Sequence, residues 1–366
     1  FNDLMNVSKD NEIVAICDVD ANHLAKAAEK FPNARQYKDF RELLEKEKSL
    51  DGVVISTPDH SHYPAAMHAI SLGKHVCVQK PLVNTLWEAN QLHEAAKKKG
   101  IITQMGNQGH TYEANRLLKE WFDAGVVGKV KEIYVWTNRP IWPQSSDMDR
   151  PKGDATPPEG MDWDRWCGPA PLRPFNAVYH PGKWRAWCDF GTGSLGDMGC
   201  HIIDPAFMAL NLRYPESVEG NVSTVYETFG KKTTGKNESY PRSSIVRFKF
   251  PARGDMPPVT LTWWDGGLMP QRPDELEDDM PFGDPNGGCL FIGDKGKLVC
   301  GCYGLNPRIL NADLRDAAKK LEKTIPRIPG NSSGHEKDWI RACKGGIAAS
   351  SNFDYSGPLS EMVLMG

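Results

Sequence analysis

The sequence lacks the features that mark membrane and nucleic-acid-binding proteins. No apolar run approaches the roughly 18 residues needed to span a bilayer. The 44 Lys and Arg nearly balance the 47 Asp and Glu, which gives a formal net charge of -3, and there is no basic run. The nine cysteines form no C-x-x-C pair. We therefore expect no membrane span, no nucleic-acid partner, and buried free thiols rather than zinc ligands or disulfides.

An initiating methionine and a signal peptide are also missing, and no Gly-rich turn stands near the start. The last residues, 359–366, enter an apolar helical pattern without a stop signal. We expect both ends to be cut, so that a first strand and its Gly-rich loop lie outside this chain. The compartment stays open between the periplasm, after export, and the cytoplasm.

The first hundred residues alternate short runs of β-branched residues with helical patterns. Apolar runs of four to six residues separated by helices are typical of a parallel sheet that is covered on both faces. The sequence therefore predicts a Rossmann-type, doubly wound α/β domain at the N-terminus. Its expected strands lie within 12–20, 51–58, 74–81 and 101–107, and its helices within 21–31, 40–47, 61–73 and 84–100.

The pattern changes at about residue 129. The segment 129–138 alternates like a half-buried antiparallel strand, and 140–190 is rich in Pro, Gly and Trp, which is typical of long ordered loops. Further strand patterns predict a C-terminal α/β domain with a large, mainly antiparallel open sheet. Because 366 residues exceed a single core, we expect a dinucleotide-binding domain at 1–110 and a substrate-binding and oligomerisation domain at 111–366.

Asp18 gives the strongest cofactor signal. It ends a predicted strand, where in a dinucleotide-binding fold an acid binds the adenosine ribose hydroxyls and repels a 2′-phosphate. This favours NAD over NADP. The alternative is that Asp18 or Asp20 only caps the helix that follows.

A second strand runs directly into Thr57, Pro58, Asp59, His60 and His62. Ligands of open α/β sheets bind at the carboxyl ends of strands, so we expect these residues where the cofactor passes. For His62, a capping or packing role is the alternative.

A lysine ends the third buried strand. Lys80 is costly to bury unpaired, and Pro81 restricts it to an extended backbone, so we expect its ammonium group in the ligand crevice. A surface lysine is the alternative. Gln79 and Pro81 beside it, and Asn107 and Gln108 after the fourth strand, complete the predicted cofactor contacts.

The segment 189–210 carries an acid-base candidate. Asp197 and His201 are four residues apart, so they share one helical face, with Asp204 following. A histidine beside a carboxylate is a competent general base near neutral pH. Metal ligands and a simple helix-surface pair are the alternatives. The metal interpretation lacks a third ligand at suitable spacing, so we expect no metal.

Eight of the eleven tryptophans lie between residues 136 and 264. Indoles near arginine side chains suit a polyhydroxylated ring, although core packing accounts for about half of them. We predict that the substrate contacts are His110, Arg139, Trp142, Arg185, Trp187, Asp197 and His201.

Taken in order, the segments TPDHSH, GKHVCVQKP, GVVGKVKEI and GSLGDMGCHIID resemble the Gfo/Idh/MocA family along essentially the whole chain. The resemblance implies a Rossmann domain followed by an open-sheet domain, with the active site between them. It implies that Lys80 is the catalytic lysine, His201 the acid-base histidine, and Asp197 the aspartate beside it. The family's Glu-Lys-Pro is Gln79-Lys80-Pro81 here, so a charge that would tune the lysine is lost.

The resemblance also implies an activity. We expect hydride transfer between NAD and a secondary hydroxyl of a sugar, glycoside or polyol. The alternatives are an NAD-dependent glycosidase of the same family and a non-catalytic sugar or NAD sensor. A bacterial subgroup of sugar-associated members, often exported by a twin-arginine signal, is similar at 163–201. A homodimer or homotetramer through the C-terminal sheet is also expected.

Overall fold

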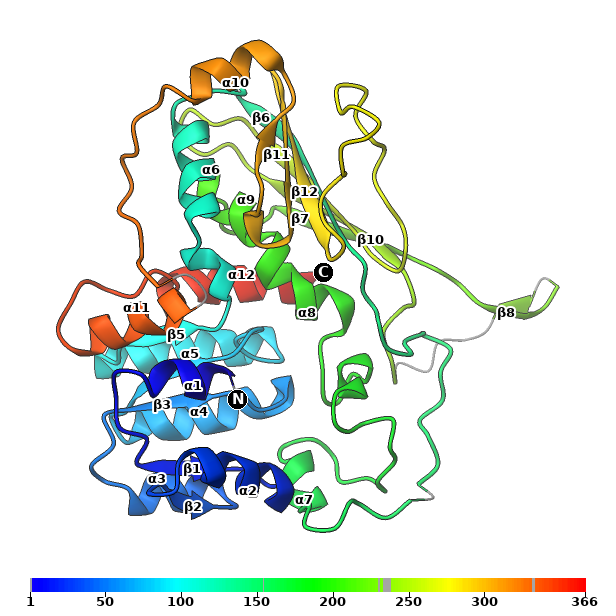
Figure 1. Cartoon of the computed structure of the whole chain (residues 1–366). Coiled ribbons are helices and arrows are strands. Elements are labelled where there is room, and N and C mark those ends of the chain that lie inside the picture. The colour runs from blue at the N-terminus through cyan, green and yellow to red at the C-terminus, as the bar shows by residue number, and fades with distance from the viewer. Residues whose placement is uncertain (1, 154, 230, 233–237, 331–332) are drawn as a thin grey trace.

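The computed structural model describes residues 2–153, 155–229, 231–232, 238–330 and 333–366. Two layered regions lie one above the other (Figure 1). The lower region holds the first parallel strands and their helices, and the upper region holds a large sheet with helices against one side. This arrangement confirms the predicted fold class.

The N-terminal strands are all parallel, as predicted. They form a two-stranded sheet of β1 (Ala15–Cys17) and β2 (Arg35–Tyr37), and a separate three-stranded sheet in the order β3-β4-β5. The other strands of this region are β3 (Gly52–Ile55), β4 (His75–Val78) and β5 (Thr103–Met105), and its helices are α1 (Asn2–Val7), α2 (Ala21–Lys30), α3 (Phe40–Lys46), α4 (His62–Ser71) and α5 (Leu86–Lys99).

Local capping explains where these helices begin and end. Asp20 and Asp39 are the N-caps of α2 and α3, and each accepts a hydrogen bond from a backbone N–H two residues on. The helix α5 begins at a capping box between Thr85 and Glu88, and it ends at Gly100, whose φ of 65° favours glycine. Capping thereby fixes the starts of α2, α3 and α5, whereas α4 has no side-chain cap.

The upper region is built on one seven-stranded sheet in the order β14-β13-β12-β6-β11-β10-β7. All neighbouring strands are antiparallel except β6 and β11. The 293–296 segment makes a tight turn between β12 and β13, through the bond from Gly293 N–H to the Gly296 carbonyl. The strands are β6 (Val130–Thr137), β7 (Ser217–Val222), β10 (Ser244–Phe250), β11 (Val259–Trp264), β12 (Gly287–Gly293), β13 (Lys297–Gly301) and β14 (Arg308–Ile309).

Helices join the two regions. The C-terminal helices α11 (Gly334–Cys343) and α12 (Phe353–Met365) return to the N-terminal elements, where α12 packs on α5 and β5. One apolar core runs from Val78 and Met105 of the parallel sheet, through Met198 and Phe353, to Phe291 of the large sheet. The division at residue 110 therefore stays a prediction, since the end of the chain packs on the first domain.

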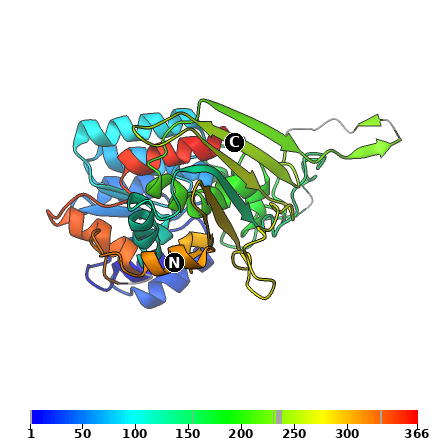
Figure 2. The ribbon, with the colours of Figure 1, turned by 90° about the horizontal axis from the view of Figure 1, so that it is seen from above.

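The remaining elements are short or lie on the periphery. A hairpin of β8 (Tyr226–Thr228) and β9 (Lys231–Lys232) extends away from the body (Figure 2). The others are α6 (Glu113–Asp123), α7 (Trp163–Cys167), α8 (Gly193–Ile202), α9 (Asp204–Ala209) and α10 (Ala312–Ala318).

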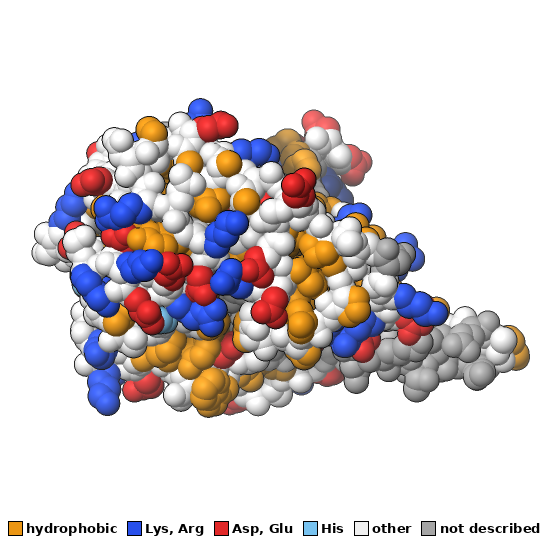
Figure 3. Space-filling view, turned by 90° about the horizontal axis from the view of Figure 1, so that it is seen from below, with side chains coloured by type: hydrophobic (Ala, Val, Ile, Leu, Met, Phe, Trp, Pro, Cys, Tyr) orange, Lys and Arg blue, Asp and Glu red, His pale blue; other side chains and the backbone are white. Residues whose placement is uncertain are grey.

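The surface agrees with the balanced composition. On the face below the N-terminal elements, acidic and basic side chains are interspersed (Figure 3). Across the described residues, none of the helices combines the length and apolar character that a bilayer crossing needs. All nine cysteines are free, as predicted. Assembly through the seven-stranded sheet stays a prediction.

Candidate active site

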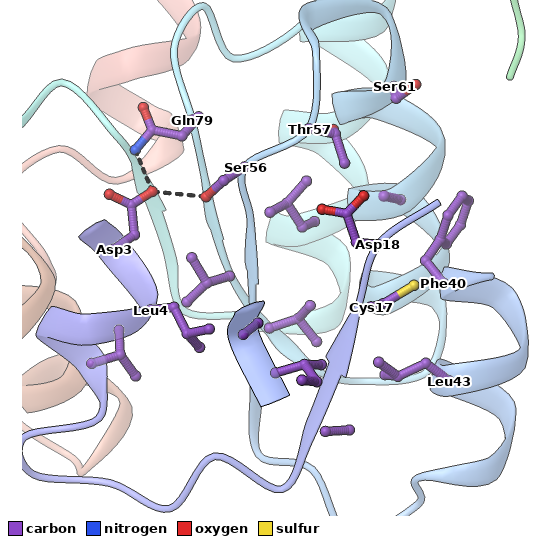
Figure 4. Close-up of a pocket in the computed structure, with 18 of the residues that line it drawn as sticks. Asp3, Leu4, Cys17, Asp18, Phe40, Leu43, Ser56, Thr57, Ser61 and Gln79 are labelled. Carbon is purple, nitrogen blue, oxygen red and sulfur yellow. Dashed lines mark hydrogen bonds between the residues drawn. The ribbon is translucent and has the colours of Figure 1, made fainter. Parts of the chain in front are cut away.

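A large cavity of about 2300 Å³ extends between β1 and β3, whose residues line it along both strands, with residues of α1 and α11 in its wall, and it reaches the carboxyl ends of β1, β3 and β4. Because parallel strands end at the same edge of a sheet, residues far apart in sequence meet there. Asp18 and Thr57 lie on one side of the cavity and Gln79 on another (Figure 4). The predicted site residues that line it are Asp18, Thr57, Pro58, Gln79, Lys80, Gln108, Arg185 and His201.

Asp18 and Asp20 divide the two roles that the sequence left open. Asp20 caps α2 by accepting from the Asn22 N–H at 2.8 Å. Asp18 is not the cap, and one of its carboxylate oxygens accepts from the Asp20 N–H at 2.9 Å. The Asp18 side chain remains 40% exposed, and burial raises the pKa of its carboxyl. Its second oxygen is therefore placed to accept hydrogen bonds from a ligand in the cavity.

Gln79 and Ser56 face α1 across the cavity. The Gln79 amide and the Ser56 hydroxyl both donate to one carboxylate oxygen of Asp3, each at 2.7 Å (Figure 4). Because Gln79 is uncharged, it can donate to an acid where a glutamate would be repelled. Gln79 thus ties the lysine-bearing loop to the first helix.

Several residues that were predicted to contact the cofactor do not line the cavity. His60 is buried with its ring nitrogens 3.0 and 3.1 Å from the Trp166 and Phe190 carbonyls. His62 is bonded to the carbonyls of Thr57 and Pro81, both at 2.8 Å. Asn107 accepts from the Ser351 hydroxyl at 2.6 Å. These bonds position the loops after β3, β4 and β5, and direct cofactor contact by His60, His62, Pro81 and Asn107 stays a prediction.

Lys80 crosses from the parallel sheet to α8. Its ammonium group donates to the Asp197 carboxylate at 2.9 Å and to the Asp197 carbonyl at 2.6 Å. Burial alone would raise the pKa of Asp197, but the charges of Lys80 and Arg185 hold it well below its usual range. An ionised aspartate therefore fixes the lysine, a contact that the sequence analysis did not predict.

His201 stands one helical turn after Asp197 on α8 and also lines the cavity. Burial and then the charge of Lys80 hold its pKa well below the usual range, so the imidazole is neutral. Its Nδ1 atom is buried and has no hydrogen-bond partner among the described residues. Since a buried polar atom without a partner is costly, this nitrogen is a place where a ligand hydroxyl would be favourable.

Tyr303 is a neighbour of His201 that no local sequence pattern identifies. Its ring centroid lies 4.8 Å from that of His201, in an edge-to-face arrangement. Tyr303 has a φ of 62°, which is uncommon for a residue other than glycine, and it follows β13. Strained backbone of this kind clusters at functional sites, and here it presents the tyrosine ring to the imidazole.

Two arginines complete the surroundings of Asp197. Arg185 Nε donates to Asp197 Oδ1 at 2.9 Å, and Arg139 Nε lies 3.4 Å from Asp197 Oδ2. Trp142 donates to Gln144 at 2.9 Å, and Trp187 is fully buried in an aromatic cluster of the 161–190 segment. The arginines thus belong to the site, while substrate contact by the two tryptophans stays a prediction.

Asp204 does not join the Asp197–His201 face. The helix is interrupted at Ile203, and a new helix starts at Asp204 with Pro205 in its first turn. The Asp204 carboxylate is 3.0 Å from His110 Nδ1 and accepts from the Tyr355 hydroxyl at 2.5 Å. His110 is therefore tied to a second buried carboxylate, and its predicted contact with substrate stays a prediction.

Another polar group in the cavity wall was not anticipated. Asp20, His23 and His180 bring one ligand-type atom each to within 4.8 Å of one another, close enough for a metal ion to bridge them. His180 comes from the long loop region, and its ring lies 5.8 Å from that of His23. No spacing rule connects residues 23 and 180, so only the folded chain places them together beside Asp18.

The fold and the site define a class, a Rossmann-fold oxidoreductase whose site lies where the parallel strands end against α8. Residues 1–107 match the family model described as an oxidoreductase family with an NAD-binding Rossmann fold. Residues 135–226 match the C-terminal alpha/beta domain of the same family. The chain belongs to the Gfo/Idh/MocA oxidoreductase family.

Individual relatives agree. An uncharacterized oxidoreductase of Schizosaccharomyces pombe is 31% identical over 325 residues, which cover 84% of this chain and 75% of that protein. Levoglucosan dehydrogenase of Pseudarthrobacter phenanthrenivorans is 25% identical over 52% of this chain, and the match spans 40% of the relative's length. The WlbA dehydrogenase of Bordetella pertussis, solved with NADH and UDP-GlcNAcA, has the same fold, with a TM-score of 0.64, 16% identity, and coverage of 98% of this chain and 88% of that one.

Proposed function

We propose that this protein is a dehydrogenase that transfers a hydride between NAD and a secondary hydroxyl of a sugar, glycoside or polyol. The observation that carries the proposal is that Lys80, which is bound to Asp197 of α8, and His201 of the same helix line one cavity together with Asp18. The family membership and the carbohydrate-dehydrogenase relatives support it. No observation favours the glycosidase or the sensor.

The cavity residues fit a dinucleotide. Asp18 would accept hydrogen bonds from the adenosine ribose, and Thr57, Pro58 and Gln108 would line the remainder. When bound, the cofactor supplies the hydride acceptor. The ionised carboxylate of Asp18 repels a 2′-phosphate, which is why we propose NAD in preference to NADP.

The chain's own residues handle the proton. His201 is neutral, and we place the proton taken from the substrate hydroxyl at its unpartnered Nδ1. The Lys80 ammonium donates a hydrogen bond to the same oxygen and stabilises the charge that develops there. Asp197, held by Lys80 and Arg185, keeps that ammonium group in place.

The test removes the ammonium group. Lys80→Ala should lower kcat by about 10²- to 10³-fold, the range seen when one preorganised donor is lost. The assay follows NADH absorbance and product identity over a panel of sugars and glycosides. Lys74→Ala is the matched control, because Lys74 is a surface lysine at the start of the same strand, bonded to the Lys48 carbonyl. Wild-type turnover by Lys80→Ala, with the fold intact, would remove the lysine from the mechanism.

The cofactor preference has its own test. Asp18→Asn keeps the size of the side chain and removes the charge that repels a 2′-phosphate. We expect the ratio of kcat/KM for NAD to that for NADP to fall about tenfold or more, because like charges at an interface oppose binding strongly. An unchanged ratio would show that Asp18 does not select the cofactor.

A further inference from the structure

Three cationic side chains converge on one buried carboxylate. Asp197 is only 7% exposed. Its Oδ1 atom receives Lys80 Nζ and Arg185 Nε, both at 2.9 Å, and its Oδ2 atom lies 3.4 Å from Arg139 Nε. One carboxylate can balance only one of these charges. The immediate surroundings of Asp197 therefore carry an excess of positive charge.

The next acid does not remove this excess. Asp59 is buried and accepts from the Thr192 hydroxyl at 2.7 Å, and burial raises its pKa to about 6 even though Lys80 acts against it. When Asp59 is ionised, three cations still face two carboxylates. Among the side chains that the structure describes, no other acid pairs with Arg139 or Arg185. His201 is neutral, so it contributes no charge to the surroundings of Asp197.

Each of the two arginines also has a hydrogen-bond donor group that no described residue uses. Arg185 uses Nε for Asp197 and Nη1 for the Gly182 carbonyl, and its guanidinium group lies 4.3 Å from the ring of Trp184. Arg139 uses Nη1 for the Asn138 side chain. No described residue accepts from the Nη2 group of either arginine. The planar guanidinium group is the side chain best suited to bind a carboxylate.

We infer that the substrate is a sugar acid, an aldonate or uronate, whose carboxylate is bound by Arg139 and Arg185 while its hydroxyl meets Lys80 and His201. This inference rests on the proposed function. A single carboxylate balances the one excess charge. A phosphate group, with a charge of about −1.5 to −2 at neutral pH, would exceed it.

The test compares matched substrates on the full chain with NAD. Glucose is set against gluconate, glucuronate and glucose 6-phosphate, and galactose against galacturonate. We expect kcat/KM for the preferred acid to exceed that of its neutral partner by at least roughly tenfold. Arg139→Gln and Arg185→Gln should each reduce that ratio roughly tenfold or more, and Arg185→Lys should reduce it less. Arg247→Gln is the control, because Arg247 pairs with Glu219 on the large sheet.

The outcomes separate the two proposals. Equal turnover of neutral and acidic partners, or a preference for the phosphate, overturns the sugar-acid inference and leaves the dehydrogenase intact. If no member of the panel reduces NAD, the dehydrogenase proposal fails. Quenching of tryptophan fluorescence by gluconate in the wild type, lost in Arg185→Gln, would then still support the anion site. No quenching would overturn it.

Discussion

At the scale of single residues, the protonation state of His201 decides how the site works. Its pKa is held well below the usual range by burial and by Lys80, so the imidazole is the neutral, proton-accepting form near neutral pH. In the proposed mechanism, activity falls at low pH because a protonated His201 can no longer accept the proton of the substrate. The acid limb of kcat/KM should therefore lie well below the usual histidine pKa of about 6.5.

His201→Asn tests this assignment directly. We expect kcat to fall about 10²- to 10⁴-fold, because the variant has no group that accepts the proton. The acid limb of the remaining activity should also disappear, which a purely structural role would not produce. His68→Asn on α4 is the control. An acid limb at about 6.5 or higher in the wild type would contradict the neutral histidine.

Local patterns predicted where Lys80, Asp197 and His201 lie, and the family resemblance supplied their proposed roles. Lys80 ends a buried strand, and Asp197 and His201 share a helical face, so each was accessible from local rules. Tyr303 was not, because its contact with His201 joins segments about a hundred residues apart. His62 was assigned to the cofactor by its position after β3, but one of its two bonds to backbone carbonyls, that to Pro81, depends on the loop after β4.

At the scale of elements, α8 carries both Asp197 and His201, and its packing is tight. A Cβ atom at Gly196 would lie 1.9 Å from Thr192 Oγ1, and Thr192 in turn donates to Asp59. Alanine at this position must therefore move either Thr192 or the helix that carries Asp197 and His201. The glycine is required here by space rather than by backbone conformation.

Gly196→Ala should lower the free energy of unfolding by about 1–3 kcal/mol, the usual cost of overpacking, although alanine is the better helix former. Turnover should fall at least roughly tenfold, because misplacing reacting groups is costly. Urea denaturation and NADH assays measure the two effects. Gly220→Ala on β7 is the control, since a Cβ there meets nothing within 4 Å. Wild-type activity in Gly196→Ala would show that α8 tolerates the shift.

Periodicity predicted the elements that are apolar and missed those that are not. The runs at β3, β4 and β5 were found because they are buried, whereas β2 has the sequence RQY and is mostly exposed. The parallel pairing of β6 with β11 could not be predicted either, since it joins strands more than a hundred residues apart. Pairing partners follow from the tertiary fold, which a single-segment pattern does not contain.

At the scale of the whole molecule, the C-terminal helix α12 packs on the N-terminal elements α5 and β5. Ser351 N–H donates to Gln104 at 3.1 Å, and Phe353 N–H donates to the Thr103 hydroxyl at 2.9 Å, so α12 is fixed to β5. The sequence predicted two consecutive domains, because nothing in the 353–365 pattern tells which core it joins. The candidate site between the two regions depends on this packing of α12 against β5.

Buried histidines make the stability of this interleaved core depend on pH. Burial lowers the pKa of His62 and of His335 to about 4, against about 6.5 in an unfolded chain. Between these values the unfolded state binds more protons, so stability that is present above about pH 6.5 is lost as the pH falls toward 4. Asp59, whose pKa is raised to about 6, acts in the opposite direction, as do four further acids whose pKa is raised by burial, whereas four further histidines with a lowered pKa act with His62 and His335.

We therefore expect a lower free energy of unfolding at about pH 5 than at about pH 7.5, by ~1–3 kcal/mol for each histidine. Urea denaturation followed by tryptophan fluorescence at the two pH values measures it. His335→Gln should show a smaller difference, because the variant removes a group bonded to the Met105 carbonyl that must stay unprotonated in the folded state. Equal stability of the wild type at both pH values would mean that these imidazoles are charged inside the core. Their carbonyl partners would then outweigh burial.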